Sequence, residues 1–215
     1  RAATRIGAPP PETAAVAAEL LALLGVDFEV CTSEFPEHPV IGWSPLEQAK
    51  HFAREKARCV AQVRLQDFIL GSDTVIELDG QLLGKPLHLE DARTMLSRLA
   101  GRCHHVHTAV AICCHERGID RVEAATTHVT MKVDVEDVYS RYLASQESLG
   151  KAGAYAIQGL GGDLVERIGG DYTTVVGLPL KLVARLLQSV GYPISVDIEE
   201  LYHRKPYANW SRFAV

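Results

Sequence analysis

Residues 68–75 read FILGSDTV, and this stretch decides how the rest of the chain is interpreted. Its apolar first half predicts a buried strand over residues 68–71. Its second half places Asp73 directly after that strand. A strand end is a rigid platform, so a carboxylate there can hold a divalent cation or take a proton from water. The competing interpretation is a turn aspartate that only caps nearby backbone groups.

Helical and strand-like patterns alternate on both sides of this stretch. Ser44, Pro45 and Glu47 form a capping-box start for one helix, and Asp79-Gly80 is a strong hairpin signal. The expected helices cover residues 11–24, 45–60, 89–99, 135–145 and 178–190. The expected strands cover residues 27–31, 68–71, 74–78, 82–83, 106–114 and 122–133, the last two paired across a turn at 116–118. This order predicts a mixed α/β fold with an antiparallel component.

Two further segments carry residues suited to chemistry. Gly84-Lys85-Pro86 holds a lysine beside a rigid proline, and a compact ammonium suits a phosphate, although most exposed lysines are simply solvated. Residues 151–159 read KAGAYAIQG, in which glycines permit close backbone approach to a ligand. Gln158 offers both a donor and an acceptor to the edge of a base. A structural turn would explain the glycines equally well.

Composition excludes several classes of protein. The chain has 215 residues, 47% of them hydrophobic and 23% charged, which is typical of a globular protein. A net charge of −5 argues against a nucleic-acid binder. No apolar run approaches the roughly 18 residues of a membrane span, and residues 1–15 lack the apolar core of a secretory signal. The five cysteines have no paired spacing, so we expect a soluble, cytoplasmic protein with reduced thiols.

Taken together, these segments resemble the Maf family of nucleoside triphosphate pyrophosphatases. The resemblance covers roughly residues 20–190, and we expect one domain over residues 1–215 with a C-terminal extension at 191–215. The matching motifs are FEV at 28–30, SEFPE at 33–37, AREKA at 53–57, GSDTV at 71–75, GKP at 84–86, LAG at 99–101, TAV at 108–110, KAGAYAIQG at 151–159 and VVGLP at 175–179.

The resemblance implies a fold and an activity. The family fold is an elongated mixed sheet with flanking helices and a cleft between two lobes. The implied activity is hydrolysis of a nucleoside triphosphate to the monophosphate and pyrophosphate, with dTTP, UTP or modified pyrimidine nucleotides as substrates. Family members use a divalent cation, Mg²⁺ or Mn²⁺, are usually homodimers and are linked in name to septum formation. No nucleic-acid or membrane partner is expected.

The resemblance also assigns roles to individual residues. Asp73 matches the acidic proton acceptor, and Glu37 matches a carboxylate near the metal, so these two form the expected metal site. Lys56 and Lys85 match lysines that face the phosphates. Thr74 and Gln158 match positions that separate the dTTP/UTP branch from the branch acting on 7-methyl-GTP.

One motif departs from the family pattern. The family opens with Ser-x-Ser-Pro-Arg-Arg, whereas residues 6–13 here read IGAPPPET, without the serines or arginines. Glu12 brings a negative charge to a stretch that would contact phosphate. The alternative function is therefore a catalytically weak or inactive relative that binds a nucleotide or a partner and acts in cell division.

Histidines and aromatic residues suggest other sites. CHHVH at 103–107 and CCH at 113–115 contain zinc-binding residue types. Their spacing fits no standard finger, and neighbouring side chains on a strand point to opposite faces, so zinc is the less favoured interpretation. Tyr155 either stacks on a base or packs in the core. The aromatic tail after Pro193 is interpreted as a packing extension, with partner binding as the alternative.

Overall fold

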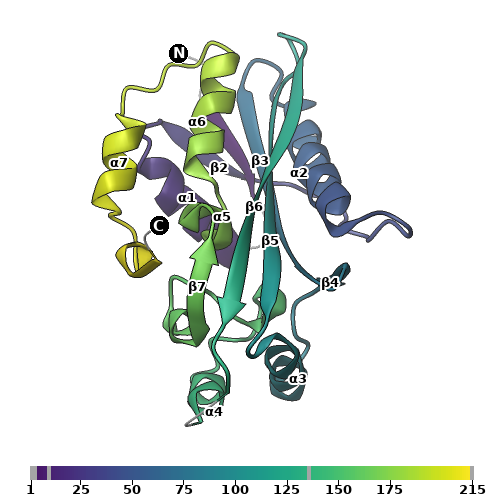
Figure 1. Cartoon of the computed structure of the whole chain (residues 1–215). Coiled ribbons are helices and arrows are strands. Elements are labelled where there is room, and N and C mark those ends of the chain that lie inside the picture. Colours follow the sequence, from purple (N-terminus) through teal and green to yellow (C-terminus); the bar gives the residue numbers. More distant parts are fainter. Residues whose placement is uncertain (1–3, 9–10, 135–136, 214–215) are drawn as a thin grey trace.

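The computed structural model describes residues 4–8, 11–134 and 137–213, with side chains from residue 14 onward. A single mixed sheet runs through this part of the chain (Figure 1). Its strands are β1 (Thr4–Ala8), β2 (Phe28–Thr32), β3 (Phe68–Leu78), β4 (Gln81–Leu83), β5 (Cys103–Cys114), β6 (Ile119–Met131) and β7 (Val165–Gly169). The strand order is β2-β1-β3-β5-β6-β7, and β4 pairs with the free edge of β3.

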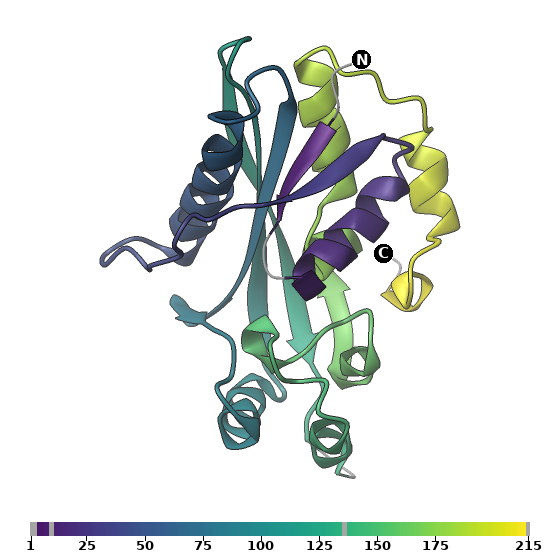
Figure 2. The same ribbon diagram turned by 180° about the vertical axis from the view of Figure 1, so that it is seen from behind.

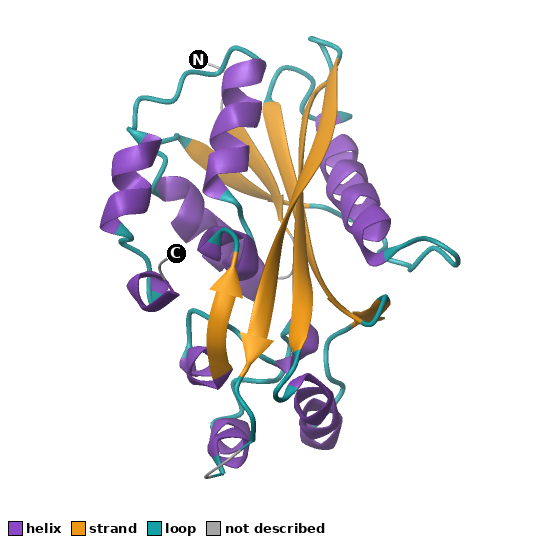
Figure 3. Cartoon of the chain, viewed as in Figure 1, coloured by secondary structure: helices purple, strands orange, loops and turns teal. Residues whose placement is uncertain are grey.

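Helices cover both faces of this sheet (Figure 3). The α-helices are α1 (Pro11–Ala22), α2 (Pro45–Ala61), α3 (Leu89–Leu99), α4 (Val138–Ala144), α5 (Tyr172–Val176), α6 (Leu180–Ser189) and α7 (Ile198–Arg204). Short 3₁₀ turns follow at η1 (Ala152–Ala154), η2 (Leu160–Leu164) and η3 (Trp210–Phe213). Because β1 pairs in parallel with β2 and β3 while the other pairings are antiparallel, the expected mixed α/β fold is confirmed.

The central strand β3 differs from the sequence-based expectation. Two strands, 68–71 and 74–78, were expected on either side of a polar break, but β3 runs without interruption and pairs with β5 from Ile69 to Glu77. The long partner strand supplies continuous backbone hydrogen bonds, so the polar residues do not end β3. Gly71 is needed where α2 crosses the strand, because a Cβ there would collide with the carbonyl oxygen of Ala53.

Helix α2 begins as the sequence predicts. The Ser44 hydroxyl accepts from the Glu47 amide, and the Glu47 carboxylate accepts from the Ser44 amide, which completes the capping box. Its small residues pack on one face of β3 and β5, forming a buried cluster of Ala49, Ala53, Ala57, Val60, Ile69, Ala109 and Ala111. Alanines on both sides bring the helix close to the sheet, which places the next residues along α2 beside β3.

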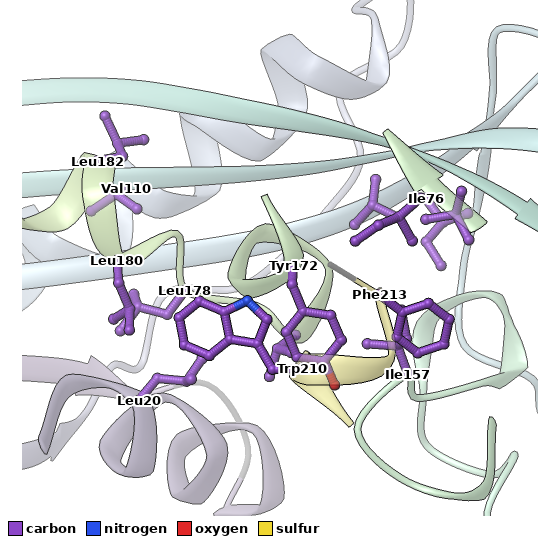
Figure 4. Close-up of a cluster of buried hydrophobic side chains, with 14 of the residues drawn as sticks. Leu20, Ile76, Val110, Ile157, Tyr172, Leu178, Leu180, Leu182, Trp210 and Phe213 are labelled. Atoms are coloured by element: carbon purple, nitrogen blue, oxygen red, sulfur yellow. The ribbon is translucent and has the colours of Figure 1, made fainter. Parts of the chain in front are cut away.

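The opposite face of the sheet carries the main hydrophobic core. Helix α1 contributes Leu20, which is fully buried, and α6 contributes Leu180. The C-terminal segment closes this core, because Trp210 is 3% exposed and its ring stacks against Tyr172 with 6.0 Å between centroids (Figure 4). The aromatic residues Trp210 and Phe213 of the tail therefore pack into the hydrophobic core, which is what the interpretation of the tail as a packing extension predicts.

Element boundaries shift by a few residues elsewhere. The helix expected over 135–145 corresponds to α4, which covers Val138–Ala144 after Asp137 in a left-handed conformation (φ 56°), and residues 135 and 136 lie outside the described residues. Strand β6 starts three residues earlier than expected, and β5 likewise starts at Cys103 rather than Val106. Among the described residues, none of the helices is long and apolar enough to cross a membrane.

Candidate active site

A gap in the strand pairing of β3 lies beside a pocket. On its outer edge, β3 pairs with β1 only as far as Gly71 and with β4 only from Ile76. Residues 72–75 therefore have no strand beside them on that edge among the described residues. A pocket of about 680 Å³ opens there, within the size range of small-molecule sites. Figure 2 shows this side of the molecule, with α1 and α2 above the gap and α3 and α4 below it.

The pocket brings together residues from distant parts of the sequence. Its upper wall comes from α1, α2 and the end of α5, and its lower wall from β4 and the segment 150–158. The family resemblance implied a cleft between two lobes, and this pocket corresponds to it. All six expected site residues line it: Glu37, Lys56, Asp73, Thr74, Lys85 and Gln158.

Lys56 lies between two carboxylates at the base of this pocket. Its Nζ is 2.6 Å from Glu37 Oε1 and 2.8 Å from Asp73 Oδ1. The Lys56 side chain is 3% exposed and that of Asp73 is 10% exposed, whereas Glu37 remains 44% exposed. Lys56 is thus a buried residue of α2 that pairs with a carboxylate of β3.

Burial and charge act in opposite directions on these groups. Removal from water raises the pKa of Asp73 to about 6, even though the Lys56 ammonium acts to lower it. Burial acts to lower the pKa of Lys56, but Asp73 and Glu37 together hold it above its usual value, so the lysine stays charged. A carboxyl with a pKa near neutrality is suited to exchange a proton with water in this pocket.

Thr74 takes part in a directed chain of hydroxyl groups. The Thr108 hydroxyl donates to the Thr174 carbonyl at 2.7 Å, and Thr74 Oγ1 lies 2.8 Å from Thr108 Oγ1. Since the Thr108 proton is already used, the Thr74 hydroxyl must be the donor of that second bond. The oxygen of Thr74 is therefore left as an acceptor toward the pocket.

The segment 150–158 is fixed from three sides. The Gly153 amide donates to the Gly84 carbonyl, which ties this segment to the loop that carries Lys85. Gly153 has φ of 64°, a left-handed conformation that favours glycine, and a Cβ there would lie 2.6 Å from the end of the Ile76 side chain. Asn209 Nδ2 donates to the carbonyls of Ile157 and Gly159, 3.0 Å each, on either side of Gln158.

The structure adds residues that the sequence interpretation did not place in the site. Lys151 lines the pocket with Lys85, and its position at the start of the KAGAYAIQG motif was the available signal. Asn209 had no signal at all, because it lies far along the chain in the aromatic tail. Tyr155 lines the pocket although it is only 5% exposed, and its hydroxyl bonds His104 Nε2 at 2.7 Å, so it packs in the core at the pocket wall. Stacking on a base stays a prediction.

The N-terminal stretch that departs from the family signature lies partly outside the described residues. Of the stretch 6–13 that departs from the family signature, Pro9 and Pro10 lie outside the described residues, as do all side chains before Ala14. The backbone of residues 4–8 forms β1, whose carboxyl end lies beside Gly71.

The donor groups at the base of the pocket fit a divalent cation. Glu37 and Asp73 come from different elements, yet both reach the same ammonium, so two carboxylates face one point that already holds a positive charge. Carboxylate oxygens are the hard ligands that Mg²⁺ and Mn²⁺ prefer. The expected metal ligands therefore suit that class of ion, and the identity of the ion stays a prediction.

The fold and the pocket together define the class of protein. A mixed sheet with a cleft that gathers three lysines, two carboxylates and an amide is a site for a polyanionic ligand with a hydrogen-bonding head group. The family model described as "Maf-like protein" matches residues 17–190. The chain belongs to the Maf family.

Curated relatives are similar over most of their length. A dTTP/UTP pyrophosphatase of Syntrophus aciditrophicus is 41% identical over 174 residues, covering 81% of this chain and 85% of that protein. The dTTP/UTP pyrophosphatase of Geobacter sulfurreducens is 42% identical, covering 80% of this chain and 91% of the relative. Among solved structures, a nucleoside-triphosphatase (dITP/XTP pyrophosphatase) of Mycobacterium abscessus gives a TM-score of 0.39 at 16% identity, covering 60% of this chain and 73% of that one. That likeness is too distant to add to the argument.

Proposed function

We propose that this protein hydrolyses nucleoside triphosphates to the monophosphate and pyrophosphate, with UTP and dTTP as preferred substrates. The observation that carries the proposal is the buried Lys56 between Asp73 and Glu37, in a pocket that also presents Lys85 and Gln158. The curated relatives that bear the name dTTP/UTP pyrophosphatase support the same substrate class.

Asp73 acts as the general base in this proposal. Its Oδ1 accepts from Lys56, so the other carboxylate oxygen takes the proton of a water molecule. The water oxygen bonds to the α-phosphorus, and the bond from that phosphorus to the bridging oxygen breaks. The electron pair leaves with pyrophosphate. A base with a pKa of about 6 is ionised at neutral pH yet retains appreciable basicity.

Lysines neutralise the charge that develops on the leaving pyrophosphate. Lys56 is held in place by its two carboxylates, whereas Lys85 and Lys151 line the lower wall on segments joined by the Gly153–Gly84 hydrogen bond. Preorganised positive groups stabilise the transition state because they need no reorganisation as charge moves. This local charge is required since the chain as a whole has a net charge of −5.

Thr74 and Gln158 select the base. Thr74 faces the pocket as an acceptor, so it suits the ring N–H of uracil or thymine and meets a lone pair on the ring nitrogen of cytosine. The Gln158 amide supplies a donor for a base carbonyl. A site built from hydrogen-bonding groups discriminates strongly, because its polar atoms stay unpaired with the wrong base.

Glu37 and Asp73 would hold a divalent cation, Mg²⁺ or Mn²⁺, in this proposal. When bound, the ion supplies electrostatic stabilisation of the negative charge on the phosphates. Following the family resemblance, we also propose one domain over residues 1–215, a homodimer and a cytoplasmic location.

The alternative function is a weak or inactive nucleotide-binding relative with a regulatory role in septum formation. The absence of the Ser-x-Ser-Pro-Arg-Arg signature favours it, since an arginine fork binds phosphate in a way that lysine cannot copy. The retained pocket residues favour the enzyme.

Pyrophosphate release from UTP, dTTP, CTP, 7-methyl-GTP and ATP, with and without Mg²⁺ or Mn²⁺, tests the proposal. We expect turnover of UTP and dTTP that needs added metal. Binding of UTP without release of pyrophosphate under any of these conditions would favour the regulatory alternative. Preference for 7-methyl-GTP would place the chain in the other branch of substrate selectivity.

A further inference from the structure

A second cluster of ligating side chains lies outside the pocket, on the sheet face that α2 partly covers. Glu77 of β3 and His105 and His107 of β5 each offer one ligand atom, and these three atoms lie within 4.8 Å of one another. None of the three residues lines the pocket. From this cluster we propose that the protein binds one Zn²⁺ ion at Glu77, His105 and His107.

The strand register explains why these side chains meet. Alternate residues of a strand share a face, so His105 and His107 project from β5 on the same side while His104 projects into the core. Glu77 is directly opposite His105 in the antiparallel pairing of β3 with β5. The alternation that argued against a zinc site in the run CHHVH is therefore what separates His105 and His107 from His104 and brings them to Glu77.

The chemistry of this cluster favours a transition metal over magnesium. Two imidazoles and one carboxylate form a ligand set common for zinc with an open fourth position, whereas Mg²⁺ prefers oxygen alone. Tetrahedral zinc ligands stand roughly 3.4 Å apart at ordinary bond lengths. His107 Nε2 and Glu77 Oε2 are now 2.7 Å apart, so small rotations bring the three donors to that spacing.

The surroundings of His107 support ligation. Its side chain is 7% exposed, and its second ring nitrogen, Nδ1, lies 2.7 Å from the Thr126 hydroxyl. A hydroxyl can donate or accept, so Thr126 is able to hold the tautomer in which Nε2 is free for a metal. The His128 ring packs against His105 with 4.4 Å between centroids, which limits how far the His105 ring turns.

The site lies close to the catalytic strand without belonging to the pocket. Glu77 is four residues beyond Asp73 on the same face of β3, or roughly 13 Å along the strand. An ion there would link β3 to β5 and add to the stability of the folded state, because it binds only where the strands are paired.

Zinc titration of the metal-free protein in the presence of excess Mg²⁺ tests this proposal. Calorimetry should give one Zn²⁺ per chain for the wild type, for Asp73→Asn and for His115→Ala, which changes an exposed histidine in the β5–β6 turn. We expect His105→Ala and Glu77→Gln to weaken binding by about tenfold or more, and Thr126→Val to weaken it about 10- to 100-fold. Circular dichroism checks that each variant folds.

Co²⁺ absorption spectra identify the ligand atoms. A visible band typical of four-coordinate cobalt, without a thiolate charge-transfer band, is expected for nitrogen and oxygen ligands and should vanish in His105→Ala. Equal zinc affinity in the wild type, His105→Ala and Glu77→Gln would overturn the proposal. So would loss of zinc in Asp73→Asn alone, since the ion would then belong to the pocket, or a thiolate band that disappears in Cys103→Ser.

Discussion

Lys56 and Asp73 form an ion pair with 2.8 Å between Nζ and Oδ1, although neither side chain exposes more than a tenth of its surface. Taking two charges out of water is costly, and a buried pair is often no more stable than an apolar one of similar volume. We infer that the pair is kept for the chemistry of the pocket. The same geometry sets the expected behaviour of its variants.

Lys56→Met should destabilise the protein and abolish turnover. It leaves Asp73 buried without its cation, which typically costs about 3–5 kcal/mol. The double variant Lys56→Met/Asp73→Asn should recover part of that stability and remain inactive. Urea unfolding at neutral pH measures the first effect and pyrophosphate release the second. Lys50→Met, on the same helix, is the matched control. A double variant as unstable as Lys56→Met would contradict the pairing argument.

Thr74→Val should erode the preference for UTP over CTP. The variant removes the acceptor that faces the ring N–H of uracil, while its size and β-branching stay the same. We expect the ratio of kcat/KM values to fall about 10- to 100-fold. Thr94→Val, on the exposed side of α3, should leave the ratio unchanged. An unchanged ratio in Thr74→Val would show that Thr74 does not read the base.

Asn209→Ala should alter substrate selection from outside the pocket. Asn209 donates to the carbonyls on both sides of Gln158, so its loss frees the segment that presents this amide. We expect Asn209→Ala and Gln158→Ala to change the UTP/CTP ratio of kcat/KM values in the same direction, and the double variant to be no worse than Gln158→Ala alone. Asn209→Gly, which tolerates the φ of 62° found there, separates the lost donor from backbone strain. Additive effects would mean that the two residues act independently.

Asp120→Asn should lower stability at neutral pH but have less effect in acid. Asp120 of β6 accepts from Arg54 and Arg58 of α2, and these hydrogen bonds hold its pKa at about 2. A lowered folded-state pKa gives stability that is full above about pH 4 and is lost as pH falls through 2. Since Asp120 is 30% exposed, we expect a loss of only about 1 kcal/mol at pH 7.

Urea unfolding of the wild type and Asp120→Asn at pH 7 and pH 3 measures this difference. The gap between the two proteins should narrow at pH 3. Asp27→Asn, which changes an exposed aspartate before β2, serves as the control and should follow the wild type at both pH values. A gap that widens in acid would contradict the sign of the pKa shift.

Local sequence signals predicted most of the elements. The capping box at Ser44 and the Asp79-Gly80 turn depend on contacts between residues close in sequence, so they can be predicted without knowledge of the fold. The break expected inside β3 was wrong because continuity there depends on β5, which lies some 35 residues further along the chain. The β-propensity of a short segment carries no information about a partner strand that is distant in the sequence.

The site was predictable only where a motif carried it. Glu37, Lys56, Asp73, Thr74, Lys85 and Gln158 were assigned through family resemblance, and the structure brings all of them to one pocket. Their individual roles stay predictions. Asn209 reaches the pocket segment across 52 residues of sequence, and His105 meets Glu77 only through strand register. Neither contact leaves a local pattern, since both depend on the tertiary arrangement.

The most direct test of the central claim is pyrophosphate release from UTP by the wild type and by Asp73→Asn, with product analysis and saturating metal. We expect UMP and pyrophosphate in equal amounts from the wild type. We expect a loss of about 10²–10⁴ in kcat for Asp73→Asn, which keeps the shape of the side chain but removes the base. Turnover of Asp73→Asn close to that of the wild type would contradict the assignment of Asp73 and the mechanism built on it.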